Sequence, residues 1–239
     1  MKRPTELLIL AGGLGARLRE IVPDLPKPLA PVAGRPFLSF LLENWLEQGI
    51  RSLTFLLRYK AQLIEAFLAE EQQTGLLKEC KVRIAIEPQA LNTGGAVAYA
   101  IRQHRISGSF LVANGDTWLA TGIKAISGTK FPSLGVVHVD DSQRYGAVQL
   151  EGDRVVAFKE KQDSGEPGWI NTGLYHLCGT TFDHWNGEPF SLETDLFPRL
   201  AKAGQLRAVR IESEFLDIGV PRDYLRFCRW ADSDKAAAL

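Results

Sequence analysis

The amino-acid sequence predicts an α/β protein with a doubly wound, mixed but mostly parallel sheet and a more strand-rich second half. Short apolar runs alternate with segments of helical periodicity through residues 1–116, as strand-helix-strand units do. Beyond Asp116, short β-rich runs follow one another between polar turns. The 239 residues fit one domain, residues 1–239, which we divide into halves at 1–116 and 117–231. Residues 232–239 lack apolar periodicity, and we expect that tail to fray.

The individual elements follow from the same patterns. An apolar run over residues 6–10 ends in a glycine loop, which is typical of a strand buried on both faces of a parallel sheet. A 3.6-residue period predicts a helix from Phe37, with Pro36 suited to its first turn and Gly49 to its end. Further strands are expected over 53–57, 82–86, 110–113, 134–139, 147–150, 155–158, 170–177 and 206–211, and further helices over 61–71, 95–102, 193–203 and 221–230.

Composition excludes several function classes. The 28 Lys and Arg residues balance the 28 Asp and Glu residues, so no net field draws nucleic acid or an anionic membrane to the protein. The N-terminal apolar run is far shorter than the roughly 20 residues of a membrane span, and it lacks a signal-peptide pattern. A cytoplasmic protein is therefore expected. The three widely spaced cysteines and four histidines indicate neither a disulfide framework nor a zinc enzyme.

A glycine-rich loop over residues 11–18 follows the first strand directly. Gly12, Gly13 and Gly15 would let backbone N–H groups approach phosphate oxygens, and Arg17 supplies a planar charged donor. Leu18 stands where a dinucleotide-binding fingerprint needs glycine, and the Gly-Lys-Ser/Thr of a P-loop is absent. The loop indicates phosphate binding, although a plain strand-to-helix turn stays open.

A second feature is the proline-rich segment 25–32, which contains one lysine. Three prolines stiffen the chain around Lys27 and would hold its ammonium in a fixed place. The alternative is a proline-rich loop with a solvated lysine.

The glycine loop and the Pro26-Lys27-Pro28 segment together resemble the signature of the sugar-1-phosphate nucleotidyltransferases. The motifs 91–96, 114–116, 144–146, 160–161, 171–173 and 216–219 follow in the order of that family. Within the family, segments 144–148 and 215–221 look most similar to D-glycero-α-D-manno-heptose 1-phosphate guanylyltransferases, and mannose-1-phosphate guanylyltransferases come close behind. The resemblance implies a Rossmann-like, GT-A-like nucleotidyltransferase fold. Ala16 and Asn92 depart from the family, which usually has Thr and Gly at these positions.

The resemblance also implies the residues of the site. The nucleotide would contact Leu10, Ala11, Gly12, Gly13, Gly15, Arg17, Lys27, Glu87, Leu91, Thr93, Gly94, Asn114, Gly115 and Asp116. The sugar phosphate would contact Tyr145, Gly146, Glu160, Lys161, Asn171, Thr172 and Gly173. The catalytic residues would be Arg17, Lys27, Asp116, Lys161 and Asp217.

Two aspartates are candidate Mg²⁺ ligands. Asp116 follows an apolar strand, and Asp217 lies between an apolar pair and a glycine. If the two carboxylates converge, they would hold Mg²⁺ together with nucleotide phosphate oxygens and water. Asn114-Gly115 can also form a hairpin turn, and Asp217 can be an ordinary residue at a helix entry.

Glu87 bears on the choice of base. Relatives that select uracil or thymine often have Gln here, whereas a carboxylate can accept from both guanine donors, N1–H and the 2-amino group. Glu87 therefore favours guanine, although backbone groups near residues 91–95 could read the base instead.

We thus expect a Mg²⁺-dependent enzyme that joins GTP to a sugar 1-phosphate, with heptose or mannose as the sugar. A UTP- or dTTP-using relative is an alternative, and so is a binding domain of the same fold that has lost catalysis. A homodimer is among the assemblies that the sequence leaves open. The sequence lacks the Gly-x-Ser-x-Gly elbow of an α/β hydrolase.

Overall fold

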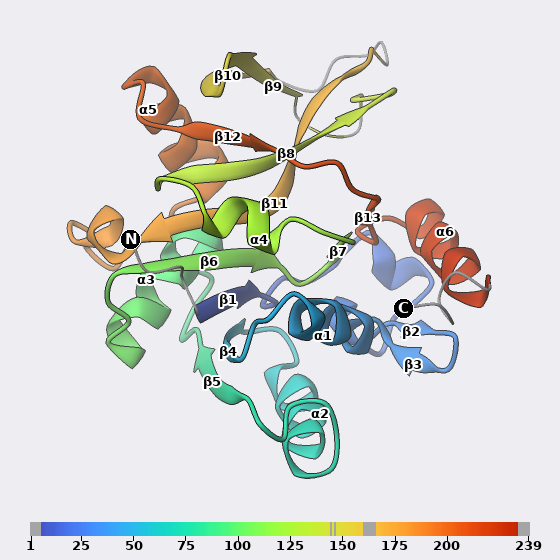
Figure 1. Cartoon of the computed structure of the whole chain (residues 1–239). Coiled ribbons are helices and arrows are strands. Elements are labelled where there is room, and N and C mark those ends of the chain that lie inside the picture. The colour runs from blue at the N-terminus through green and yellow to red at the C-terminus, as the bar shows by residue number, and fades with distance from the viewer. Residues whose placement is uncertain (1–5, 144, 146, 160–165, 234–239) are drawn as a thin grey trace.

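The computed structural model of the chain is organised around one large mixed sheet (Figure 1), and it describes residues 6–143, 145, 147–159 and 166–233. The strand order is β5-β4-β1-β6-β11-β8-β12-β10-β9. Strands from both halves of the sequence therefore share this sheet.

The first half of the sheet is parallel throughout. It contains β1 (Glu6–Leu10), β4 (Ser52–Leu57), β5 (Lys81–Ile86) and β6 (Ser109–Asn114). Because parallel strands place their carboxyl ends on one edge, the loops after these strands meet there. The alternating pattern of residues 1–116 correctly predicts this arrangement.

The second half is largely antiparallel. Strand β11 (Gly168–Cys178) pairs antiparallel with β6 and with β8 (Ser133–Val139). Strand β12 (Arg207–Arg210) runs parallel to β8, and the hairpin of β9 (Ala147–Glu151) and β10 (Arg154–Lys159) lies at the edge. The expected mixed α/β sheet is confirmed, and its parallel pairs are concentrated in the first half.

Helices cover both faces of the sheet. Alternate residues of β1 divide between two cores, with Leu7 and Ile9 in one and Leu8 in the other, as expected for a strand buried on both faces. The first core includes residues of α1 (Phe37–Glu47), α2 (Ala61–Gln73), α4 (Ile123–Ser127) and α6 (Pro221–Asp232). The second includes residues of α3 (Asn92–His104) and α5 (Phe197–Lys202).

Two helices differ most from the expected ranges. Helix α3 begins at Asn92 rather than at residue 95, and Asn92 itself has a positive φ of 57°, which glycine adopts freely and asparagine tolerates. The helix expected over residues 193–203 is a π-helical turn, η4 (Leu192–Leu196), followed by α5.

Several short elements escape the sequence patterns. These are β2 (Pro31–Val32), β3 (Arg35–Pro36), β7 (Thr117–Leu119), β13 (Phe215–Asp217), the short helix α4 and the 3-10 turns η1 (Leu18–Glu20), η2 (Lys27–Leu29) and η3 (Gly179–Phe182). The pairing of β7 with β13 matters most for the site, because it places Asp217 opposite Thr117, the neighbour of Asp116. Among the helices of the described ranges, none combines the length and the apolar character that crossing a bilayer needs.

Candidate active site

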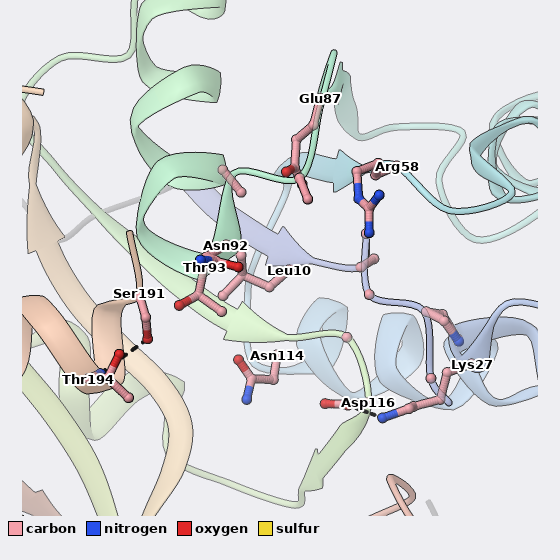
Figure 2. A pocket seen from close by; sticks show the side chains of 18 residues that line it. Leu10, Lys27, Arg58, Glu87, Asn92, Thr93, Asn114, Asp116, Ser191 and Thr194 are labelled. Atoms are coloured by element: carbon pink, nitrogen blue, oxygen red, sulfur yellow. Dashed lines mark hydrogen bonds and ion pairs between the residues drawn. The ribbon is translucent and has the colours of Figure 1, made fainter. Parts of the chain in front are cut away.

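A cavity of about 540 Å³ opens at the carboxyl ends of the parallel strands (Figure 2). Its walls come from the loops after β1, β4, β5 and β6, from the start of α3 and from η4. The lining residues are Leu10, Ala11, Gly12, Gly13, Gly15, Lys27, Pro28, Arg58, Glu87, Ala90, Asn92, Thr93, Ala96, Asn114, Gly115, Asp116, Ser191 and Thr194. The volume lies within the usual range for a small-molecule site.

Most of the expected nucleotide-binding residues line this cavity. Leu10, Ala11, Gly12, Gly13, Gly15, Lys27, Glu87, Thr93, Asn114, Gly115 and Asp116 all do so. Arg17, Leu91 and Gly94 are not among its lining residues. Arg17 is exposed at the start of η1, whereas Leu91 and Gly94 are buried.

Gly94 has a packing role that explains its burial. A Cβ at this position would come within 2.2 Å of the Phe190 ring, and the Gly94 N–H donates to the Phe190 carbonyl over 2.9 Å. The absence of a side chain therefore lets α3 lie close to the segment that leads into η4.

An ion pair occupies one end of the cavity. Lys27 Nζ lies 2.6 Å from Asp116 Oδ2, and the two side chains are only 13% and 30% exposed. Lys27 belongs to the turn η2 between its prolines, and its ammonium is paired and largely buried rather than solvated. Figure 2 shows the pair pointing toward one another from the η2 turn and the end of β6.

Asp217 lies beside this ion pair. Its Oδ1 accepts a hydrogen bond from the Gly219 N–H over 2.6 Å, and a Cβ on Gly219 would lie 3.3 Å from Lys27 Nζ. Burial raises the pKa of Asp217, and the nearby Asp116 carboxylate raises it further, while Lys27 and Arg17 partly offset both effects. The structure thus brings both aspartates together with Lys27, while Arg17 acts on Asp217 only through its charge.

The two aspartates form a donor set suited to a hard divalent cation. Carboxylate oxygens suit Mg²⁺. Burial is the main cause of the raised pKa of Asp217, and the Asp116 carboxylate is the second, so a cation bound between the two aspartates would favour their charged forms. No group of three or more His, Cys, Asp or Glu side chains with metal-binding proximity occurs among the described residues. Nucleotide oxygens and water would therefore have to complete the coordination shell.

Glu87 and Arg58 line the cavity where the loops after β5 and β4 approach Gly12. A Cβ on Gly12 would lie 2.9 Å from Glu87 Oε1 and 3.3 Å from Arg58 Cβ. Glu87 Oε2 accepts a hydrogen bond from the Leu91 N–H over 2.9 Å. Burial raises the pKa of Glu87, against the opposing effects of that hydrogen bond and of the Arg58 charge.

A polar network connects the wall of the large cavity with the expected sugar-binding segment. Asn171 Nδ2 donates to the hydroxyl of the fully buried Tyr175 over 2.9 Å, and that hydroxyl donates to Glu193 Oε1 over 3.1 Å. Glu193 Oε2 in turn accepts from Thr93 Oγ1 over 2.6 Å and from Ser191 Oγ over 2.9 Å. Thr93 and Ser191 line the cavity, so the network ties its wall to β11.

Of the other expected sugar-binding residues, some lie among the described residues and some do not. Thr172 and Gly173 line a second, much smaller cavity of about 20 Å³, of which Asn114 forms part of the wall. Gly173 has a φ of 75°, and a Cβ there would lie 2.4 Å from Asn114 Nδ2, so glycine permits this approach. Tyr145 packs edge-on against Phe215. Gly146, Glu160 and Lys161 lie outside the described residues.

Four polar lining residues are absent from the set inferred from the sequence: Arg58, Asn92, Ser191 and Thr194. Arg58 directly follows the buried strand β4, and a charged residue at the carboxyl end of a parallel strand is a signal that could have found it. Asn92 follows the expected motif residue Leu91 directly. Ser191 caps η4 by accepting from the N–H groups of Glu193 and Thr194.

Comparisons with known proteins agree with this geometry. One curated relative is a D-glycero-α-D-manno-heptose 1-phosphate guanylyltransferase from Campylobacter jejuni, which is 34% identical over 93% of this chain and 98% of the relative. Another is mannose-1-phosphate guanylyltransferase 1 from Arabidopsis thaliana, which is 32% identical over 91% of this chain and 62% of the relative. The crystal structure of HddC from Yersinia pseudotuberculosis, complexed with GMP-PN, is similar with a TM-score of 0.82 and 33% identity, covering 95% of this chain and 99% of the other. The family model described as nucleotidyl transferase matches residues 6–231, and the chain therefore belongs to the nucleotidyl transferase family.

Proposed function

We propose that this protein transfers a guanylyl group from GTP to a sugar 1-phosphate, which yields a GDP-sugar and pyrophosphate. The observation that supports this most strongly is one cavity with two chemically different ends. Lys27 and Asp116 gather charge at one end, with Asp217 beside them although it does not itself line the cavity, whereas Glu87 presents a carboxylate acceptor at the other end. A nucleoside triphosphate has matching ends, a base with hydrogen-bond donors and a polyphosphate.

In the proposed reaction, a phosphate oxygen of the sugar 1-phosphate attacks the α-phosphorus of GTP. A new P–O bond forms, the bond between the α- and β-phosphates breaks, and pyrophosphate leaves with its electron pair. Both reactants are polyanions, so catalysis consists mainly of positioning and charge neutralisation. Lys27 and Arg17 would neutralise the triphosphate, and Lys161 the phosphate of the nucleophile.

We propose Mg²⁺ as the metal, held by Asp116 and Asp217. When bound, it would neutralise phosphate charge and help to orient the triphosphate. Lys27 lies close to both carboxylates, so its ammonium would neutralise phosphate charge beside the metal.

Guanine is the proposed base because Glu87 can accept from both N1–H and the 2-amino group. The names of the relatives from Campylobacter and Arabidopsis support the same choice. A heptose 1-phosphate is the first candidate for the acceptor, since the chain covers almost the whole heptose-specific relative but only 62% of the mannose-specific one. We assign residues 1–116 chiefly to the nucleotide and 117–231 chiefly to the sugar phosphate, with Ser191 and Thr194 reaching across to the nucleotide cavity.

The experiment is a pyrophosphate-release assay with Mg²⁺ and every pairing of GTP, ATP, UTP, CTP and dTTP with heptose 1-phosphate or mannose 1-phosphate. The proposal expects turnover with GTP, and faster turnover with the heptose. Preference for mannose 1-phosphate would change the sugar, and preference for UTP or dTTP would overturn the base assignment. Binding of GTP without pyrophosphate release from any pair would favour a regulatory binding domain.

A further inference from the structure

Arg58 places a half-buried guanidinium in the cavity wall. It is the first residue after β4 and lies across from the glycine loop, where the Tyr59 N–H donates to the Gly12 carbonyl over 3.3 Å. A Cβ on Gly12 would come within 3.3 Å of Arg58 Cβ, so the base of the side chain is fixed against this loop. Figure 2 shows Arg58 and Glu87 together at the upper edge of the cavity, above the ion pair of Lys27 and Asp116.

The Arg58 guanidinium makes no hydrogen bond or ion pair with any other residue in the described part of the chain. Its charge does act on Glu87, since it lowers the pKa of that carboxyl group against the effect of burial. The two opposite charges thus lie near one another in one cavity wall without joining in a salt bridge of 4.0 Å or less. Such an arrangement leaves the donors of Arg58 available to a ligand, together with Glu87 Oε1 and the second lone pair of Glu87 Oε2, whose first accepts from the Leu91 N–H.

We propose that Arg58 is a specificity-determining residue that donates a hydrogen bond to the 6-oxo group of guanine, beside the N1–H and 2-amino groups, which donate hydrogen bonds to Glu87. This inference rests on the proposed guanylyl transfer. Guanine presents an acceptor at O6 directly next to its donor at N1, which matches a cation next to a carboxylate.

The two residues would then exclude different bases. Adenine and cytosine have an amino group where guanine has O6 or uracil has O4, so their amino hydrogens would face the N–H donors of Arg58. Uracil and thymine keep the oxo group and the adjacent N–H, but they have an acceptor in place of the 2-amino group, and that acceptor would face Glu87. Arg58 would therefore reject the amino bases, and Glu87 the remaining pyrimidines.

The test changes the protein side chain and the base atom that it is proposed to contact, first separately and then together. We would measure kcat/KM for GTP, 6-thio-GTP and ITP in the wild type, Arg58→Ala, Arg58→Lys and Glu87→Gln. 6-Thio-GTP replaces O6 with a weak sulfur acceptor and keeps both donors, whereas ITP keeps O6 and lacks the 2-amino group. The matched control is Arg35→Ala, since Arg35 lies outside the cavity and pairs with Glu43.

Arg58→Ala should lower kcat/KM for GTP and ITP about tenfold or more, the effect of losing one charge-assisted hydrogen bond. It should lower the value for 6-thio-GTP much less, and Arg58→Lys should keep part of the preference for the oxo group. Glu87→Gln should instead remove the difference between GTP and ITP. Arg35→Ala should change none of these ratios.

An equal loss of kcat/KM for GTP and 6-thio-GTP in Arg58→Ala would overturn the assignment, because Arg58 would then act on the phosphates or on the fold. Thermal melts of each variant separate a folding defect from a binding defect. If the wild type releases no pyrophosphate, the proposed transfer fails on its own. Equilibrium binding of GMP and 6-thio-GMP then applies the same comparison to Arg58 without catalysis.

Discussion

Lys27 Nζ lies 2.6 Å from Asp116 Oδ2, and this ion pair joins the η2 turn to the end of β6 across 89 positions of the sequence. The two groups have different proposed partners, since Lys27 would neutralise phosphate and Asp116 would bind Mg²⁺. In the metal-free chain they neutralise one another in a partly buried place. The same pair therefore serves both the fold and the proposed chemistry.

Removing one member of this pair should affect stability and activity differently from removing both. Lys27→Met and Asp116→Asn should each lower turnover by about 10²-fold or more, because each removes a group that acts on the polyphosphate or its metal. Each should also destabilise the fold by about 1–3 kcal/mol, since the remaining charge loses its partner. The double variant should recover much of the stability and none of the activity. Thermal melts and pyrophosphate release measure the two effects, and a double variant with near-wild-type turnover would remove both residues from the mechanism.

Asp217→Asn should stabilise the metal-free protein while abolishing its response to Mg²⁺. Burial and Asp116 raise the pKa of Asp217, so the folded state binds this proton more tightly than the unfolded chain does. The contribution of this group to stability consequently falls as the pH rises from the usual range of an aspartate through the raised value. At neutral pH in EDTA, the variant should melt at or above the wild-type temperature. Adding Mg²⁺ with a non-hydrolysable GTP analogue should raise the melting temperature of the wild type only.

The exposed Asp140 provides the control for this prediction. Asp140→Asn should behave as the wild type in both conditions. A normal Mg²⁺ response in Asp217→Asn would show that this carboxylate is no metal ligand.

Glu87→Gln should weaken the preference for GTP over UTP and change the pH dependence of KM. Burial raises the pKa of Glu87, so its carboxylate gains a proton at a higher pH than an ordinary glutamate does. Protonation removes an acceptor for guanine, and KM for GTP in the wild type should therefore rise as the pH falls through that pKa. The glutamine variant should start from a KM about tenfold higher and show no such rise. Steady-state kinetics from pH 5 to 8 check this, and identical pH profiles would exclude Glu87 from base binding.

Tyr175→Phe should destabilise the protein by about 1–3 kcal/mol, because it leaves Asn171 Nδ2 and Glu193 Oε1 without their shared partner. Burial raises the pKa of Tyr175 well above its usual value, so its hydroxyl stays protonated and donates to Glu193. KM for the sugar phosphate should rise more than KM for GTP, since Asn171 loses its orientation. Tyr99→Phe is the matched control, because the Tyr99 hydroxyl has no assigned hydrogen bond to the described residues. Equal melting temperatures for both variants would contradict this account of the network.

His176 should make the protein less stable in mild acid. The ring is buried, and neither nitrogen has a hydrogen-bond partner among the described residues. Burial lowers the pKa of His176, against smaller opposing effects of the Ile126 and Thr129 carbonyls. The unfolded chain thus binds a proton that the folded chain does not, and stability falls as the pH drops below about 6.5, by at most about 1.4 kcal/mol per pH unit.

His176→Leu should remove this slope, and replacing the exposed His184 by Gln should leave it intact. Urea unfolding at pH 7, 6 and 5 measures the slope. The same slope in His176→Leu as in the wild type would assign the acid sensitivity to other groups.

The sequence could predict those parts of the site that lie next to a long regular element. Asp116 comes two residues after the buried strand β6, Glu87 directly follows β5, and Lys27 stands between prolines, so local patterns locate these residues and the family resemblance supplies their roles. Strands β7 and β13 have three residues each, which is too short for a periodic signal, although their pairing brings Asp217 to Asp116. Ser191 and Thr194 reach the cavity through contacts between distant segments, namely the packing of Phe190 on Gly94 and the hydrogen bond from Thr93 to Glu193.

The central claim is that the cavity joins guanylate to a sugar 1-phosphate, and the most direct measurement is the product itself. Wild-type protein, GTP, Mg²⁺ and heptose 1-phosphate would be incubated, and the GDP-sugar quantified by mass spectrometry beside pyrophosphate, with Asp217→Asn in parallel. The account predicts equal amounts of GDP-heptose and pyrophosphate from the wild type and about 10²-fold less from the variant. Pyrophosphate without GDP-sugar, or equal product from both proteins, would contradict it.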